Sequence, residues 1–519
     1  MENVRRNLSE NDRHALAGLT VGTLAYMVIV GLICALLTGC GGGGGGGGSS
    51  NGGPSTGGGS SSGGSTAPSD WNSSAANQPL VVVAASKEPR HHGPISDEAE
   101  FEPVGCPNGS GANDGAWATW FGDRDNPGTL NYTVSANSFG ANFAPGDPHP
   151  RLNSEGVSVF ASGRKHQFPT VQAFSDFSAL FCAESADAGD GSRVHIAAKR
   201  LVDNGDGTIT TGIDIMSISG VAGEQRFPRN VANAGRTIMT TYWQEVGGSP
   251  GLGAQLFNPL GTIGSNLVVD TGDCRISDVV SAAGGTYVAY DKLVAGGMRG
   301  AFAAFVSDAG DTTVITLSAN AGGDATFPQL DLAADGHIVA GWPDSRDGTF
   351  KPYGGKFQSD ATPLWGANGL RLANVVVQGN DRGVDVACHP DGSSTFLMEE
   401  IVDSGHTNVS SLRTDDSGSV VRARVVLQEN AQQFTLLNVF FDTANQVFGS
   451  WNGPNTVNFN DYAADGSGIT AADSLSFGAA TSNSRRNIRG IPLPGGKLFT
   501  LFQERRGGIE KVVGRIPHR

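Results

Sequence analysis

The stretch Ile338-Val339-Ala340-Gly341-Trp342 decides the fold of this chain, together with Tyr353-Gly354-Gly355-Lys356-Phe357 and Leu370-Arg371-Leu372-Ala373 that follow it. The turn Ala334-Asp335-Gly336 precedes the first run, and glycine-rich or polar segments separate the others. Short apolar or alternating runs bounded by turn residues are typical of β-strands rather than of helices. This part of the sequence therefore predicts a unit of short antiparallel strands.

Runs like the first one recur through residues 79–519, with starts spaced by roughly 50–60 residues. A second and in most units a third strand follow each run, and one more strand leads into the next run. Four strands of about six residues with connections of about five fill roughly 45–50 residues, the size of a propeller blade. The eight runs are Ala116–Phe121, Ala179–Cys182, Ile238–Trp243, Tyr287–Tyr290, Ile338–Trp342, Thr395–Met398, Val447–Trp451 and Leu498–Phe502.

The pattern predicts an all-β domain, a single β-propeller of about eight four-stranded blades, with seven as the alternative. The last unit, from Arg489 to Arg519, has room for three strands only. The segment Pro79–Ala84 is a strand without a partner in its own unit, and it resembles the outer strand of other units. We expect it to complete the last blade and close the ring, since closure covers an exposed sheet edge.

The fifth unit resembles the W-x-D-x-R, Y-x-x-x-x and W-G-x-N-G repeats of bacterial secreted propellers. The matching segments are Trp342-Pro343-Asp344-Ser345-Arg346, Tyr353–Phe357 and Trp365-Gly366-Ala367-Asn368-Gly369. Phe121-Gly122-Asp123-Arg124 and Phe502-Gln503-Glu504-Arg505 echo the first part. This resemblance implies the propeller fold and no particular activity, because the fold hosts enzymes and binding modules alike.

The N-terminal segment is expected to be a targeting signal rather than part of the folded domain. A basic segment with Arg5, Arg6 and Arg13 precedes an uncharged apolar run from Leu16 to Leu37. This order is typical of an export signal, and a transmembrane helix is the alternative. The run ends in Leu37-Thr38-Gly39-Cys40, which resembles the lipobox of bacterial lipoproteins. The resemblance implies cleavage before Cys40 and lipidation of its thiol, so residues 1–39 are predicted to be the signal peptide.

Acylation of Cys40 would make the lipid bilayer a partner, because two or more acyl chains anchor a protein stably. Gly41 stands where an inner-membrane retention Asp is common in lipoproteins. The resemblance thus implies the outer membrane of a Gram-negative bacterium, with the domain facing the periplasm or the cell surface. Residues 40–78, with an unbroken glycine run at 41–48, are too poor in apolar side chains to fold and are predicted to be a disordered tether.

Composition excludes some functions. The 519 residues carry a net charge of −15, which argues against a nucleic-acid partner.

Six cysteines occur, and Cys106, Cys182, Cys274 and Cys388 belong to the predicted domain. None forms a C-x-x-C pair, so we expect no metal site. Among disulfides only Cys106–Cys182 is geometrically tolerable, while buried free thiols fit the pattern better.

An acidic residue follows the run in seven of the eight units, and equivalent blades would place these acids on one face as a ring. One interpretation is a ring that binds a cation or ligand. The interpretation we favour is structural, with each acid pairing with a neighbouring Arg or capping a turn. The seven acids are Asp123, Glu184, Glu245, Asp291, Asp344, Glu399 and Glu504.

No catalytic or cofactor motif is present in its required context: H-E-x-x-H is absent, no G-x-S-x-G forms a nucleophile elbow between a strand and a helix, and no G-x-G-x-x-G follows a strand. Asp203–Ile209 lacks the ligand oxygens of an EF-hand loop, and a hairpin turn is expected there. We therefore expect no cofactor and a propeller that binds an extracytoplasmic protein or glycan rather than an enzyme. The alternatives are a glycoside hydrolase or polysaccharide lyase on the same scaffold, and a scaffold for envelope assembly.

Overall fold

The computed structural model of the chain describes residues 248–431, except 319–321 and 380–382, and parts of the chain on either side. The chain divides into two units, residues 1–64 and 65–519, and every described residue belongs to the second. The predicted signal peptide and the whole predicted tether, Cys40 included, lie outside the described residues. The other described segments are 81–84, 104–107, 116–122, 133–139, 157–160, 165–174, 178–186, 194–204, 208–215, 223–233, 237–246, 438–441, 446–453, 456–463, 473–476, 484–493, 497–506 and 509–515.

The described strands form eight four-stranded antiparallel sheets, which confirms the predicted all-β architecture and decides for eight blades over seven. The first four sheets follow the chain order. They comprise β2 (Val104–Pro107), β3 (Ala116–Gly122), β4 (Thr133–Phe139) and β5 (Val157–Ser158); β6 (Lys165–Ala173), β7 (Ser178–Ala186), β8 (Val194–Asp203) and β9 (Ile209–Ile215); β10 (Gln225–Ala232), β11 (Ile238–Val246), β12 (Ser249–Asn258) and β13 (Gly261–Thr271); and β14 (Cys274–Ala282), β15 (Gly285–Leu293), β16 (Arg299–Ser307) and β17 (Thr312–Thr316).

The next three sheets repeat this order, and the eighth departs from it. The three comprise β18 (Gln329–Leu332), β19 (Ile338–Asp344), β20 (Lys351–Phe357) and β21 (Leu370–Arg371); β22 (Val384–Cys388), β23 (Ser394–Ile401), β24 (Thr407–Thr414) and β25 (Val420–Ala431); and β26 (Asn438–Phe441), β27 (Gln446–Gly453), β28 (Thr456–Ala463) and β29 (Asp473–Ser476). The eighth sheet has the order β30 (Ser484–Leu493), β31 (Lys497–Arg506), β32 (Ile509–Arg515) and β1 (Val81–Ala84).

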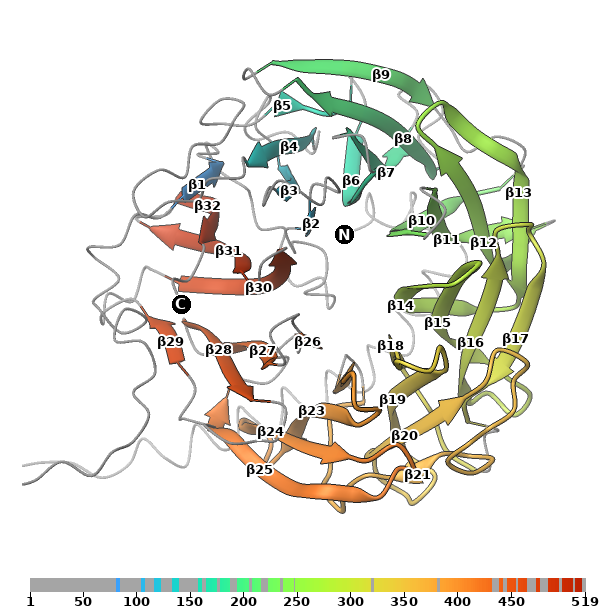
Figure 1. Ribbon diagram of the computed structural model, residues 1–519, viewed down its shortest axis with the longest axis vertical. Helices are drawn as coiled ribbons and strands as arrows, with labels where there is room; N and C mark the ends of the chain where they lie inside the picture. Colours follow the sequence, from blue (N-terminus) through green and yellow to red (C-terminus); the bar gives the residue numbers. More distant parts are fainter. Residues whose placement is uncertain are drawn as a thin grey trace, which may run out of the picture. The chain divides into compact units, whose positions relative to one another are not determined.

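The N-terminal strand closes the ring, as the sequence predicts. β1 pairs antiparallel with β32, with Val81 opposite Gly514 and Val82 opposite Val513. It is the outer strand of a sheet whose other three strands come from the C-terminus (Figure 1). The last sheet thus obtains its fourth strand from the opposite end of the domain, which covers an edge that would otherwise be open.

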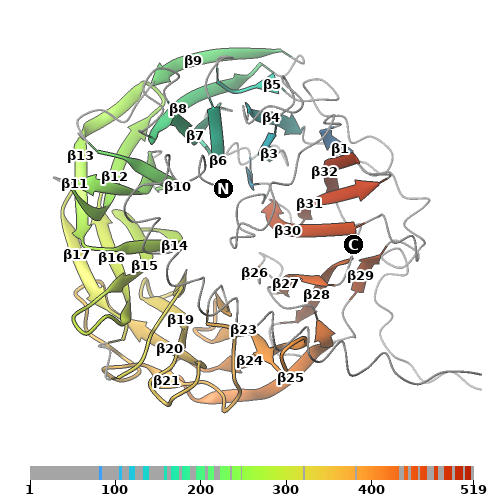
Figure 2. The same ribbon diagram turned by 180° about the vertical axis from the view of Figure 1, so that it is seen from behind.

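Neighbouring sheets contact one another in a closed circuit. The first strand of each sheet touches the first strand of the next, from β2 and β6 through β10, β14, β18, β22 and β26, and β30 touches both β28 and β2. Figures 1 and 2 show β6, β10 and β14 on the inner side of the ring and β9, β13 and β17 on its outer side. The predicted runs are the second strands, such as β11 and β19, and the strand that leads into each run is the innermost one.

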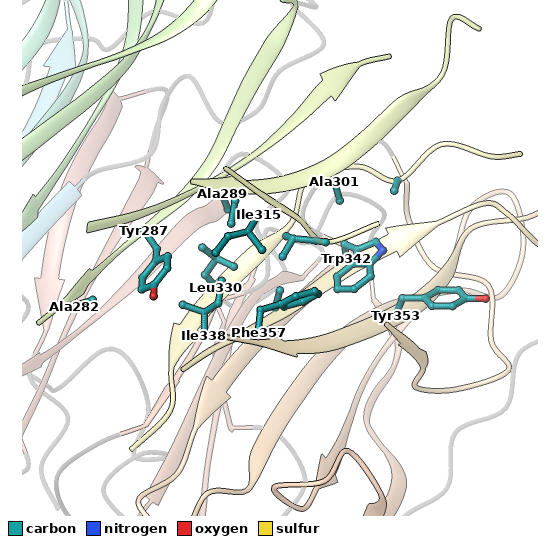
Figure 3. Packing of buried hydrophobic residues seen from close by; sticks show 14 residues of the cluster. Ala282, Tyr287, Ala289, Ala301, Ile315, Leu330, Ile338, Trp342, Tyr353 and Phe357 are labelled. Carbon is teal, nitrogen blue, oxygen red and sulfur yellow. The ribbon is translucent and has the colours of Figure 1, made fainter. Parts of the chain in front are cut away.

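The core lies in layers between successive sheets rather than in one centre. Between the fourth and fifth sheets, Tyr287, Ile315, Leu330, Trp342 and Phe357 belong to one buried cluster (Figure 3). Comparable layers occupy the four other interfaces from the first sheet to the sixth. Alternating side chains of a strand therefore serve two interfaces, as sheets packed face to face require.

The cysteines of the described core are free. Cys182, Cys274 and Cys388 are buried and unpaired, and the Cys182 Sγ lies 3.6 Å from Thr240 Oγ1. Burial raises the pKa of Cys182 and of Cys274 to about 12. A free Cys182 favours the interpretation of packed thiols over the Cys106–Cys182 disulfide; the side chain of Cys106, on β2, lies outside the described residues.

Within the described residues, no helix is long and apolar enough to cross a membrane.

Candidate functional site

The predicted acids lie at equivalent places in their sheets. Glu184, Glu245, Asp291, Asp344, Glu399 and Glu504 all lie near the C-terminal end of a second strand, namely β7, β11, β15, β19, β23 and β31. The side chain of Glu504 lies outside the described residues, and so does Asp123 as a whole. Because the second strands run in the same direction, these acids share one end of the sheets with the beginnings of the innermost strands. This end of the domain is the candidate functional site.

Asp291 is enclosed by cationic and backbone donors. Its side chain is fully buried, and it accepts hydrogen bonds from Arg275 Nε at 2.8 Å and Arg275 Nη2 at 2.9 Å. Arg299 donates a further bond through Nε, and the backbone N–H of Phe327 donates one at 3.0 Å. A two-pronged guanidinium contact is among the stronger charge-assisted bonds in proteins. Asp291 therefore serves as an internal partner for groups of its own sheet and the next.

Asp344 lies within the W-x-D-x-R segment and is paired as the sequence predicts. Arg346 Nη2 donates to Asp344 Oδ2, and the backbone N–H of Arg346 donates to Oδ1 at 2.9 Å. Ser318 Oγ and Trp342 Nε1 donate to Oδ2 at 2.9 and 3.2 Å. The guanidinium also stacks on the ring of Tyr353, with 4.3 Å from Cζ to the centroid. The three signature residues of the segment thus form one cluster, in which Trp342 and Asp344 are buried and Arg346 is half-buried.

Among the described residues no arginine clamps Glu184 or Glu245, and each carboxyl accepts a backbone N–H. Glu184 is 1% exposed and accepts from Gln167 Nε2 at 3.1 Å and from the backbone N–H of Phe227 at 2.9 Å. Burial raises the pKa of this carboxyl. Glu245 is half-buried and accepts from the backbone N–H of Glu224 at 3.4 Å. Glu399 is buried at the matching place on β23.

Three phenylalanines at the same end of the sheets have a left-handed backbone. The φ angles of Phe168, Phe227 and Phe327 are 51°, 56° and 44°. Phe168 and Phe227 lie at bulges in β6 and β10, and Phe327 lies two residues before β18. A left-handed conformation costs an ordinary residue about 1–2 kcal/mol, so the surroundings must impose it. A buried proline follows each one: Pro169, Pro228 and Pro328.

The ring acids hold this strained backbone. Glu184, on the second sheet, binds the N–H of Phe227 on the third, and Asp291, on the fourth sheet, binds the N–H of Phe327 ahead of the fifth. In both cases the acid at the end of a second strand reaches forward to the next blade. For Asp291 and Glu184, the structural interpretation of the acids that the sequence favours is supported by these inter-blade bonds.

The phenylalanine rings remain accessible although their backbone is fixed. Phe227 is 45% exposed, and Phe168 and Phe327 are partly exposed. The rings of Phe168 and Phe227 come from neighbouring sheets, and their centroids are 5.5 Å apart at an interplanar angle of 59°. The guanidinium of Arg275, on β14, lies 4.5 Å from the centroid of Phe327. Two such pairs thus lie at the beginnings of innermost strands: Phe168 with Phe227 across β6 and β10, and Arg275 with Phe327 across β14 and β18.

A second set of acids, which the sequence analysis missed, lies on the innermost strands. Asp278 on β14 accepts the N–H of Leu330 at 3.0 Å, and Asp331 on β18 accepts the N–H of Cys388 at 2.6 Å. Both bonds again join one blade to the next. Burial, with Asp278 nearby, raises the pKa of Asp331 to about 6. The signal that could have found these residues is an Asp inside the strand leading into three successive runs, with Asp385 on β22 as the third example.

Comparisons with known proteins give no family for the chain. No family model matches it, and neither does any curated protein. Among solved structures it is similar to the polysaccharide lyase Uly1, at 10% identity and a TM-score of 0.40 over 85% of this chain and 97% of that one. A protein of unknown function from Dyadobacter fermentans is 12% identical, with a TM-score of 0.38 over 68% of this chain and 94% of that one. An α-L-arabinanase from Penicillium chrysogenum is 10% identical, with a TM-score of 0.34 over 84% of this chain and 97% of that one. At these values the likeness says nothing about activity, and the architecture rests on the strand pairing above.

The phenylalanine positions were also missed from the sequence. The dipeptide Phe-Pro occurs at 168–169, 227–228 and 327–328, each time about ten residues before a predicted run. That recurrence could have identified these phenylalanines from the sequence.

The segment at Asp203, in contrast, behaves as predicted, because Asn204 N–H donates to Thr208 O at 3.2 Å within the β8–β9 hairpin.

Proposed function

We propose that this chain is an outer-membrane lipoprotein, acylated at Cys40, whose propeller is a binding module for an extracytoplasmic protein or glycan. The sequence Leu37-Thr38-Gly39-Cys40 after an uncharged apolar run supports the anchor. The observation that carries the binding role is the pairing of the predicted acids. Asp291 and Asp344 are buried against arginines, so neither carboxylate is exposed where a substrate could contact it.

One observation favours the enzymatic alternative. Glu184 has a pKa raised by burial, as a general acid of a glycoside hydrolase requires. Its two oxygens, however, bind Gln167 and the backbone of Phe227, and the side chain is 1% exposed. A catalytic carboxyl must reach the bond that it protonates. The arrangement therefore fits a fastening role better than a catalytic one.

The anchor is tested by Cys40→Ala in a Gram-negative host that incorporates a clickable palmitate. The wild-type chain should be labelled and should fractionate with the outer membrane. The variant should lose the label and should appear either as a soluble chain or as an uncleaved precursor. Equal labelling and fractionation of the two chains would contradict the anchor.

The binding role is tested on the full chain by cross-linking in intact envelopes and by incubation with purified polysaccharides. A binding module should retain a partner and leave polysaccharide chain lengths unchanged. The heat-unfolded chain is the control for non-specific capture. Shortening of a polysaccharide by wild type and not by Glu184→Gln would overturn the binding role in favour of the enzyme.

A further inference from the structure

The three phenylalanines before prolines form a recurring feature that the packing of the core does not require. They occupy the same place in the second, third and fifth sheets, and all three have a backbone conformation that phenylalanine rarely adopts. Strained backbone of this kind persists where the surroundings over-determine it, and it gathers at ligand sites. A merely structural turn at this φ would be served better by glycine.

Hydrogen bonds hold the backbone of Phe227 and Phe327, while the phenylalanine rings remain accessible. Glu184 and Asp291 bind the N–H groups of Phe227 and Phe327, and the prolines that follow are buried. Yet Phe227 is 45% exposed, and the other two rings keep part of their surface accessible. Because the backbone of Phe227 and Phe327 is held, contact with these rings costs less ordering of the chain.

We propose that Phe168, Phe227, Phe327 and Arg275, which we name the aromatic rim, form a binding surface for a neutral saccharide. Sugar rings present faces of C–H groups, and these pack on the electron-rich faces of aromatic rings. Arg275 adds a hydrogen-bond donor beside Phe327. Its Nε and Nη2 donate to Asp291, while no described residue accepts a hydrogen bond from its Nη1. The rim therefore combines flat apolar faces with a polar group that can bind a hydroxyl.

Two observations select this class of ligand. The chain carries a net charge of −15, and Asp291 neutralises Arg275, so a polyanionic glycan would be repelled. A standard protein interface buries about 800 Å² on each partner around a continuous apolar centre. At this end of the sheets the other exposed apolar side chains, Leu293 and Val402, lie apart on the β15–β16 and β23–β24 hairpins of the described chain. The paired rings of Phe168 and Phe227 and the pair of Phe327 with Arg275 are small platforms, which suit sugar units better than a protein interface.

This inference rests on the proposed binding role and narrows its ligand. The test uses the full chain in a detergent without a sugar head group, so that the detergent cannot compete. Cellohexaose, xylohexaose and chitohexaose are the probes, with galacturonohexaose as the charged comparison, and binding is measured by calorimetry. We expect at least one neutral probe to bind, and to bind more tightly than galacturonohexaose.

Two substitutions of Phe227 separate binding from folding. Phe227→Ala and Phe227→Gly both remove the ring and should weaken binding about tenfold or more. Glycine adopts a φ of 56° freely, so Phe227→Gly should melt at or above the wild-type temperature. Leu260→Ala is the matched control, since Leu260 is 79% exposed on the β12–β13 turn and should leave affinity unchanged.

The inference is overturned if none of the neutral probes binds, if galacturonohexaose alone binds, or if Phe227→Gly binds as tightly as wild type. These failures remain distinguishable from failure of the proposed function. A protein partner that is cross-linked equally by wild type and by Phe227→Gly would keep the binding module and discard the saccharide rim. Shortening of a polysaccharide by the wild-type chain would discard the binding module itself.

Discussion

The backbone N–H of Phe227 donates a 2.9 Å hydrogen bond to the carboxylate of Glu184, which belongs to the preceding blade. Asp291 and Phe327 repeat this relationship two blades further on, at 3.0 Å. Asp278 and Asp331 add a second set of bonds from innermost strand to innermost strand. The blades are thus joined by carboxylates that accept backbone N–H groups, in addition to the apolar layers between them.

The Asp344 cluster should be measurable as stability. Asp344→Ala leaves Arg346 and Trp342 Nε1 without their shared acceptor, so the free energy of unfolding should fall by about 1–3 kcal/mol. Urea denaturation checks this. Asp311→Ala, at an exposed residue of the β16–β17 turn, should leave the midpoint unchanged. A fully stable Asp344→Ala that loses a bound cation would instead favour a ligand-binding ring.

Closure by the N-terminal strand predicts unequal effects of two deletions. Removal of residues 79–86 exposes the edge of β32 and should lower stability by about 2–4 kcal/mol, the worth of a few backbone hydrogen bonds. Removal of residues 41–70 should leave the melting temperature unchanged, because their composition predicts a tether. Differential scanning calorimetry compares the two. Equal melting temperatures would contradict the pairing of β1 with β32.

These two predictions also show what the sequence can and cannot supply. Spacing and turn residues suffice for the strands and for Pro79–Ala84 as the closing strand, but they leave the blade count open between eight and seven. The Asp344–Arg346 pair is readable because both residues lie in one segment. The hydrogen bond that Phe227 N–H donates to Glu184 cannot be read from the sequence, because its partners are 43 positions apart and meet only through blade packing. A positive φ at a phenylalanine is equally invisible, because it contradicts local preference.

The pKa of Asp331 predicts a pH effect of defined sign. Burial raises that pKa to about 6, above the value of about 4 in an unfolded chain, so the native state holds the proton more tightly. The contribution of this group is fully present below pH 4 and is lost as the pH rises through 6. His389 acts oppositely, since burial lowers its pKa to about 4 and its contribution is lost as the pH falls.

Asp331→Asn isolates the first effect. The amide does not ionise, so the difference in unfolding free energy between wild type and variant should change between pH 4 and pH 6 and stay constant from pH 7 to 8. Chemical denaturation at each pH measures this difference. A difference that is flat across the whole range would refute a raised pKa at this position.

The free cysteines predict resistance to alkylation. Cys182, Cys274 and Cys388 are buried, and a thiol with a pKa of about 12 has almost no thiolate at pH 8. Iodoacetamide should therefore leave these three unmodified in the folded chain and label them after denaturation. Mass spectrometry without reduction reads both states. A Cys106–Cys182 link in the same spectra would show that these thiols are oxidised.

The pairing of β1 with β32 has a consequence for the order of events during synthesis. Val82 is among the first residues of the domain to be made and Val513 among the last, yet they are opposite one another in the finished sheet. The seven other sheets can each form from a contiguous segment, but the eighth must wait for the whole polypeptide. A chain cut short before residue 509 would keep β1 without its partner strand. Completion of the ring therefore has to await the synthesis of Ile509–Arg515, the strand that pairs with β1.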